Sequence, residues 1–179
     1  LAPLLMNSNA PVDPLHPLTI EKKKISGKRK KTESDHKELQ RLDFFGALYH
    51  SKNKLIIPNR CLMATMEAGA RKSKDGGKVR EGCFITKDGD LKIPTRYKTM
   101  EDLYKKEEHI FTTVVRVNRA SVLKTRPIFE KWSCDFEVEY LDDIVNKSDI
   151  KEFLVTAGRR VGICDWRPQH GRFKVTKFT

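Results

Sequence analysis

The sequence has few cysteines, and their spacing argues against two kinds of small stabilised domain. Its four cysteines form no Cys-x-x-Cys pair and lie well apart, at Cys61, Cys83, Cys134 and Cys164. We therefore expect neither a structural zinc site nor a disulfide framework, and a reducing, cytoplasmic compartment is the default expectation.

Long apolar runs and the familiar catalytic motifs are also missing. No run of about 18 apolar residues is present, so we expect no membrane span. There is no Gly-rich phosphate loop followed by Lys and Ser or Thr, which argues against nucleotide hydrolysis. Without a His-Glu-x-x-His motif or paired ligand spacing, we expect no metal or other cofactor. The chain has no signal peptide as it stands and begins at Leu1 rather than Met, so we expect residues to precede it.

Positive charge is the most prominent feature of the composition. The 179 residues include 36 Lys and Arg against 24 Asp and Glu, which gives a net charge of +12. Such an excess costs self-repulsion, and a polyanionic partner such as nucleic acid is its first physical explanation. The alternative is a basic protein without such a partner.

The order of periodic segments predicts an α+β fold. Helical periodicity marks residues 34–49, 60–72 and 148–161, and strand-like segments include 54–58, 111–117, 121–129, the strictly alternating 132–140, and 173–178. We expect one domain over residues 1–179, with an antiparallel sheet and helices on one side. A basic, partly mobile insertion is expected at about 20–33 and a basic loop at about 71–81. The final strand–helix–strand resembles half of a ferredoxin-like unit.

The turn between the last helix and the last strand is the strongest local indication of function. Gly162 and Gly171 lie on either side of Trp166, Arg167 and His170, and Arg172 follows directly. A flexible turn with planar cations and an aromatic ring suits a phosphate backbone or a stacked base. The alternative is a structural loop whose tryptophan packs on the core and whose arginines cap the helix.

Other basic residues extend this candidate site. The helix 60–72, the 71–81 loop, the strands 111–129 and the end of the last helix all contribute cations, which could together form one groove. The complete set of candidate nucleic-acid-binding residues is Arg60, Arg71, Lys72, Lys74, Lys78, Arg80, Arg116, Arg119, Lys124, Arg126, Arg159, Arg160, Trp166, Arg167, His170 and Arg172.

The strand 132–140 has an acidic outer face, formed by Asp135, Glu137 and Glu139. Their strict alternation indicates a solvent-facing row rather than a catalytic cluster. Such a row could pair with a basic surface of a neighbouring subunit, so we expect self-association along a bound strand.

Three segments resemble the RAMP superfamily, the backbone subunits of CRISPR effector complexes. These are the strand–proline–helix sequence Leu55-Ile56-Ile57-Pro58-Asn59-Arg60-Cys61-Leu62, the strand Leu4-Leu5-Met6 with its Pro-rich loop, and the late turn from Gly162 to Phe173. The segment Asp-Trp-Arg-Pro-x-x-Gly-Arg-Phe is also similar to small tailed-phage proteins. The resemblance implies a modified RRM or ferredoxin-like domain that grips a single-stranded guide RNA. It implies that Arg60 and the 71–80 region contact the strand and that the late turn closes over it.

The resemblance also bears on catalysis. RAMP proteins that cut RNA carry an aspartate in the loop after the first strand, whereas this sequence has Asn7-Ser8-Asn9, with Asp13 as the nearest acid. This departure argues against an enzyme.

Our leading prediction is therefore a non-enzymatic protein that binds the backbone of single-stranded nucleic acid, RNA more than DNA, in a phage or CRISPR-related context. Two alternatives stay open. One is a phage inhibitor that mimics a CRISPR backbone subunit and occupies the effector subunits or their guide RNA. The other is a metal-independent ribonuclease that uses His170 or Asp13.

Overall fold

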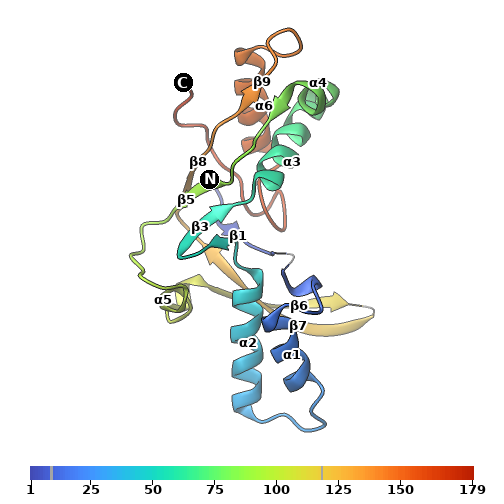
Figure 1. The fold of residues 1–179 in the computed structure, drawn as a ribbon, viewed down its shortest axis with the longest axis vertical. Coiled ribbons are helices and arrows are strands. Elements are labelled where there is room, and N and C mark those ends of the chain that lie inside the picture. The colour runs from blue at the N-terminus through green and yellow to red at the C-terminus, as the bar shows by residue number, and fades with distance from the viewer. Residues whose placement is uncertain (9, 118) are drawn as a thin grey trace. The chain divides into compact units, whose positions relative to one another are not determined.

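The protein has an α+β fold with antiparallel sheets, as the sequence predicted (Figure 1). The computed structural model describes residues 1–8, 10–117 and 119–179. Asn9, in the stretch compared above with a catalytic loop, lies outside the described residues. Every helix in the described part of the chain is too short or too polar to span a lipid bilayer.

The chain divides into two compact units. Unit 1 comprises residues 1–5, 50–94 and 130–179, and unit 2 comprises residues 6–49 and 95–129. Each unit therefore contains segments that are far apart in the sequence.

Unit 1 combines two antiparallel sheets with a pair of packed helices. Its strands are β1 (Leu4–Leu5), β2 (His50–Ser51), β3 (Lys54–Ile57), β4 (Cys83–Phe84), β5 (Gly89–Lys92), β8 (Ser133–Asp135) and β9 (Glu139–Tyr140). The larger sheet has the strand order β2-β3-β5-β8, and β4 pairs with β9 in the smaller one. The helices of unit 1 are α3 (Asn59–Ala70), η2 (Arg71–Ser73), α4 (Gly76–Gly82) and α6 (Lys147–Arg160).

Close packing of α3 on α6 forms the centre of unit 1. Ile150, Phe153, Leu154 and Ala157 are buried on one face of α6, as the periodicity predicted. Gly69 of α3 lies directly against the Phe153 carbonyl and Ala157, and it has no room for a Cβ atom. The helix does not begin with Ser148 as its N-cap. Asn146 is the N-cap instead, because its side chain accepts a hydrogen bond from the Asp149 N–H at 2.9 Å.

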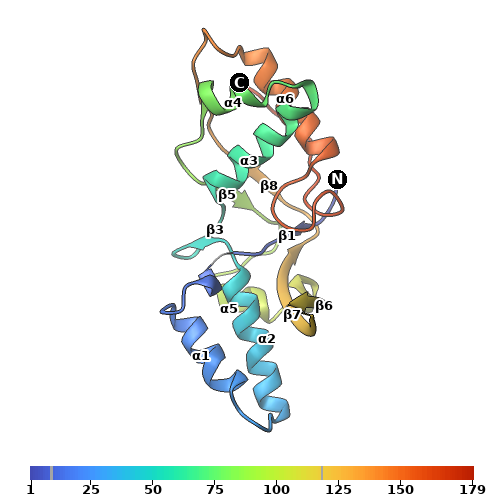
Figure 2. The ribbon, with the colours of Figure 1, turned by 90° about the vertical axis from the view of Figure 1, so that its right-hand side faces the viewer.

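Unit 2 contains a helical pair and a long hairpin. Its helices are η1 (Ala10–Val12), α1 (Pro17–Ser26), α2 (Glu33–Ala47), α5 (Met100–Tyr104) and η3 (Glu107–His109), and its strands are β6 (Ile110–Val117) and β7 (Ala120–Phe129). α1 and α2 lie side by side, and α2 packs on β7 (Figure 2). Thr32 and Asp35 form a capping box that starts α2.

A buried carboxylate connects three elements of unit 2. Asp43 of α2 is only 6% exposed, and it pairs with Lys22 of α1 and, at 3.3 Å, with Lys124 of β7. Burial, only partly offset by Asp43, lowers the pKa of Lys124. This cluster is therefore part of the interior of unit 2.

Four local predictions differ from the structure. Residues 173–178 form no strand, because Phe173 donates its N–H to Gly158 at 3.1 Å rather than to a sheet. The 71–81 segment is helical, in η2 and α4, and Val79 and Gly82 of α4 are buried inside unit 1. Much of the lysine-rich 20–33 segment belongs to α1. The alternating 132–140 segment is split, because β8 pairs with β5 while β9 pairs with β4.

Candidate nucleic-acid interface

The turn after α6 is a closed loop, which we call the C-terminal loop and define as residues 162–172. Ile163 donates its backbone N–H to the Gly171 carbonyl at 2.9 Å, which joins the two ends of the loop. Gly162 and Gly171 have φ angles of +79° and +71°, a left-handed conformation that favours glycine. The two glycines of the sequence motif are thus needed to close the loop.

The C-terminal loop is attached to the N-terminal segment by three backbone hydrogen bonds. Ala2 donates to Arg172 at 3.1 Å, Gly171 donates to Pro3 at 2.7 Å, and Asp165 donates to Leu5 at 3.1 Å. The expected flexible turn is therefore fixed by pairing with residues at the opposite end of the chain.

Trp166 is presented at the surface of this fixed loop. Its side chain is 37% exposed, so it is not the core-packing tryptophan of the alternative interpretation. Its φ is +50°, and its ring centroid lies 6.0 Å from that of His170, with the ring planes inclined at 60°. His170 also donates its backbone N–H to the Trp166 carbonyl at 3.0 Å. The tryptophan is thus partly exposed on a fixed loop.

Four arginines lie on or directly before the loop. Arg167 and Arg172 are exposed within it, and Arg167 is joined to Pro168 by a cis peptide bond. Arg159 and Arg160 end α6 and are also exposed. Cations in the last turn stabilise a helix through its dipole, so these two have a structural role at the end of α6.

The predicted cations of α3, η2 and α4 are partly neutralised by acids of unit 1. Arg71 and Arg80 both pair with Glu67, at 2.7 and 3.4 Å, and Lys78 pairs with Asp75 at 2.8 Å. The hydrogen bond from Lys78 lowers the pKa of Asp75. Exposed Arg60, Lys72 and Lys74 complete this group.

The four remaining candidates, Arg116, Arg119, Lys124 and Arg126, belong to unit 2, so the predicted groove draws on residues of two different units. Arg116 and Arg119 are exposed in the β6–β7 hairpin. Lys124 is occupied by buried Asp43, and Arg126 is only 6% exposed. Their positions indicate a structural role for these last two.

The acidic residues of the 133–140 segment are exposed, as predicted, but they are engaged within unit 1. Asp135 pairs with Lys92 at 2.5 Å, and Glu137 pairs with Lys87 at 3.4 Å. Glu139 accepts a hydrogen bond from Thr86 at 3.0 Å. Exposed ion pairs are weak, so a partner could still replace these contacts.

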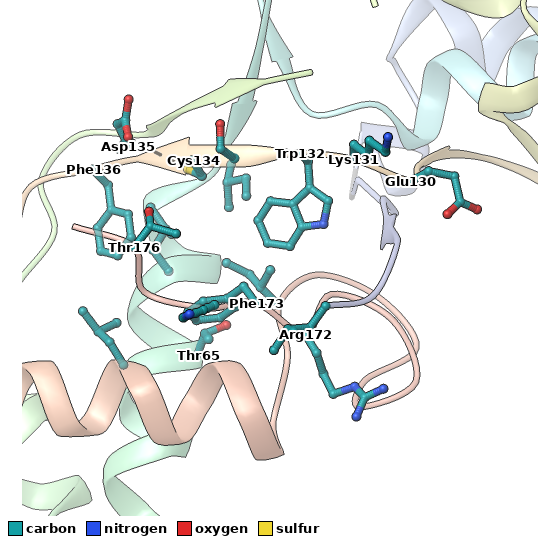
Figure 3. Close-up of a pocket in the computed structure, with 17 residues that line it drawn as sticks. Thr65, Glu130, Lys131, Trp132, Cys134, Asp135, Phe136, Arg172, Phe173 and Thr176 are labelled. Carbon is teal, nitrogen blue, oxygen red and sulfur yellow. Dashed lines mark hydrogen bonds between the residues drawn. The ribbon is translucent and has the colours of Figure 1, made fainter. Parts of the chain in front are cut away.

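Sequence reasoning missed a pocket in unit 1, shown in Figure 3. Its volume is about 380 Å³, and it lies between residues 130–136 and the segment that follows the C-terminal loop. Trp132, Phe136 and Phe173 contribute aromatic rings, and Thr65 and Arg172 also line it. The apolar alternation at residues 132 and 136 was a signal for a buried face, but not for a cavity.

Three of the four cysteines, Cys61, Cys134 and Cys164, are closer together than their spacing suggested. A side-chain hydrogen bond with Cys61 and burial raise the pKa of the Cys164 thiol well above its ordinary value, with a smaller effect of nearby Cys134. Burial raises the pKa of Cys134 to about 12. All four cysteines are free thiols, and among the described residues no group of three or more His, Cys, Asp or Glu side chains is placed to hold a metal.

Comparison with known protein families, with characterised proteins and with solved structures found no match to this chain. The resemblance to RAMP proteins therefore stays a prediction from the sequence.

Proposed function

We propose that unit 1 binds single-stranded nucleic acid through the C-terminal loop. In this proposal Trp166 stacks on a base, while Arg167 and Arg172 contact the adjoining phosphates. The observation that carries it is the 37% exposed indole of Trp166 on a loop fixed by backbone hydrogen bonds.

The chemistry of these side chains supports the proposal. A base stacked on an aromatic side chain contributes about 1–3 kcal/mol, whatever its identity. The guanidinium of arginine matches phosphate oxygens with two parallel hydrogen bonds. Because the loop is already held in one conformation, little conformational entropy is lost when a strand binds. The net charge of +12 adds a general attraction to any polyanion.

A single strand suits this surface better than a duplex. An indole can stack only on a base that has a face not covered by neighbouring bases, as in single-stranded regions. The RAMP resemblance favours RNA over DNA, a role without catalysis, and assembly of several copies side by side along the strand.

Binding of labelled oligonucleotides tests the proposal. We expect a single strand of about 12 nucleotides to bind more tightly than a duplex and to weaken steeply between about 50 and 200 mM salt. Trp166→Ala should weaken binding about tenfold at every salt concentration, since it removes stacking and no charge. A plot of the logarithm of the binding constant against the logarithm of the salt concentration measures the number of phosphate contacts. Arg167→Ala and Arg172→Ala should each make its slope shallower by about 0.7.

Lys37→Ala is the matched control for the arginine variants. Lys37 is an exposed cation of unit 2, paired with Glu33 at 2.7 Å, and its loss changes net charge by the same amount. We expect less than a twofold change in affinity for this variant. Equal binding by wild type and Trp166→Ala, or equal losses for Lys37→Ala and Arg167→Ala, would contradict the proposed site.

A further inference from the structure

The pocket of unit 1 has aromatic walls in fixed positions. The ring centroids of Trp132 and Phe173 lie 6.3 Å apart with their planes inclined at 67°, and Phe136 contributes a third ring to the lining (Figure 3). Trp132 donates its indole N–H to the Ala2 carbonyl at 3.0 Å, so its ring is held in one orientation. These rings line a space of about 380 Å³, which is in the size range of sites for small ligands.

One polar group of this pocket lacks a partner. Thr65 of α3 is only 1% exposed and lines the pocket, yet its hydroxyl has no hydrogen-bond partner among the residues that the structure describes. Buried hydroxyl groups are nearly always paired, because leaving one unpaired is unfavourable. A ligand with a donor or acceptor in the pocket would satisfy this group.

The rim of the pocket carries charges that suit an anion next to an apolar ring. Arg172, Lys131 and Lys174 contribute cations. Glu130 and Asp135 also line the rim, but Asp135 is paired with Lys92 at 2.5 Å. In Figure 3 the guanidinium of Arg172 points away from the aromatic rings. Arg172 also belongs to the C-terminal loop, so the pocket and the proposed strand-binding surface share this residue.

We propose that the pocket binds one unstacked nucleobase of the strand that occupies the C-terminal loop. The base packs in the pocket against the edge-to-face pair of Trp132 and Phe173 rings, and its edge forms a hydrogen bond with the Thr65 hydroxyl. Its phosphate lies outside the pocket, within reach of Arg172. This inference rests on the proposed function, because the same strand supplies the base.

Mononucleotides test the pocket without the rest of the strand. In a Trp166→Phe variant, Trp132 is the one remaining tryptophan and reports on its own surroundings. We expect adenosine, guanosine, cytidine or uridine 5′-monophosphate to quench its fluorescence saturably, while ribose 5-phosphate has no effect. Adding Thr65→Val, which keeps the shape and removes the hydroxyl, should weaken this binding about fivefold, and Thr65→Ser should retain it.

A structural role of Thr65 makes a different prediction. If Thr65 only packs in the core, Thr65→Val leaves nucleotide binding unchanged, and that result overturns the inference. Quenching by ribose 5-phosphate equal to that by nucleotides overturns it too, as does the absence of quenching by any nucleotide. The thermal midpoint of Thr65→Val should equal or exceed that of the parent, which separates lost binding from lost folding.

The two proposals fail in different ways. Absence of mononucleotide binding, with strand binding still sensitive to Trp166→Ala, removes the base pocket and leaves the proposed function. Mononucleotide binding that depends on Thr65, with no binding of any single strand, removes the proposed function and shows that the pocket serves free nucleotides instead.

Discussion

Gly171 packs directly against Ile163, and its carbonyl accepts the Ile163 N–H at 2.9 Å. This contact closes the C-terminal loop, while the N–H of Gly171 bonds to Pro3. Gly171→Ala should destabilise unit 1 by about 3 kcal/mol, because φ is +71° and an added Cβ would overlap the Ile163 carbonyl oxygen. Urea unfolding measures this change, and a variant as stable as wild type would show that the loop is not held in this way.

Packing of α3 on α6 predicts a contrast between two glycines. Gly69→Ala should cost about 2–3 kcal/mol, because the new Cβ would overlap the Phe153 carbonyl and lie 2.8 Å from the Ala157 Cβ. Gly77→Ala, in α4, meets nothing within 4 Å and should stabilise the protein by about 0.5–1 kcal/mol through helix propensity. Thermal unfolding of the two variants compares them directly. Equal effects would contradict the close contact of the helices.

The cluster around Asp43 predicts a rescue. Asp43→Ala leaves the half-buried Lys124 without its carboxylate, and we expect unit 2 to lose about 2 kcal/mol. Lys124→Met in the same chain removes the stranded charge and keeps an apolar stem, so it should restore part of that loss. Hydrogen exchange in α2 and β7 measures the local effect. If the double variant is no more stable than Asp43→Ala alone, the ion pair is not what holds these elements together.

The buried thiols predict a loss of stability at alkaline pH. Burial raises the pKa of Cys134 from an ordinary 9.0 to about 12. The folded state therefore retains a proton that the unfolded state releases, and this contribution to stability is complete below pH 9 and declines toward pH 12. At about pH 10 the loss from Cys134 alone should be about 1.4 kcal/mol.

Cys134→Ser provides the comparison for this pH effect, since serine does not ionise in this range. Between pH 8 and pH 10, the unfolding free energy of wild type should fall by about 1.4 kcal/mol relative to that of Cys134→Ser. Parallel curves would show that Cys134 titrates normally and is accessible to solvent.

Local sequence patterns predicted many of the elements but not their tertiary partners. The stripe of Ile150, Phe153, Leu154 and Ala157 predicted α6 and its buried face, because helical period is a property of neighbouring residues. The alternation at residues 173–178 predicted a strand, yet that segment has no sheet to join. Strand formation requires a partner, and alternation alone does not supply one.

The candidate site shows the same division between local and distant information. Trp166, Arg167 and Arg172 were found from their position between and beside two glycines. Fixation of the loop by Ala2, Pro3 and Leu5 could not be predicted, because it joins the two ends of the chain. The pocket and the division into two units also depend on segments that are distant in sequence.

Mapping the contact of a bound strand tests the central claim most directly. Trypsin should release residues 161–172 as one peptide that contains the whole C-terminal loop with Trp166, since the Arg167–Pro168 bond resists cleavage. Ultraviolet cross-linking of single-stranded RNA followed by mass spectrometry should place the principal cross-link in this peptide. The cross-link should disappear in Trp166→Ala. Cross-links confined to the lysine-rich 20–33 segment or to the β6–β7 hairpin, with residues 161–172 unmodified, would contradict the account.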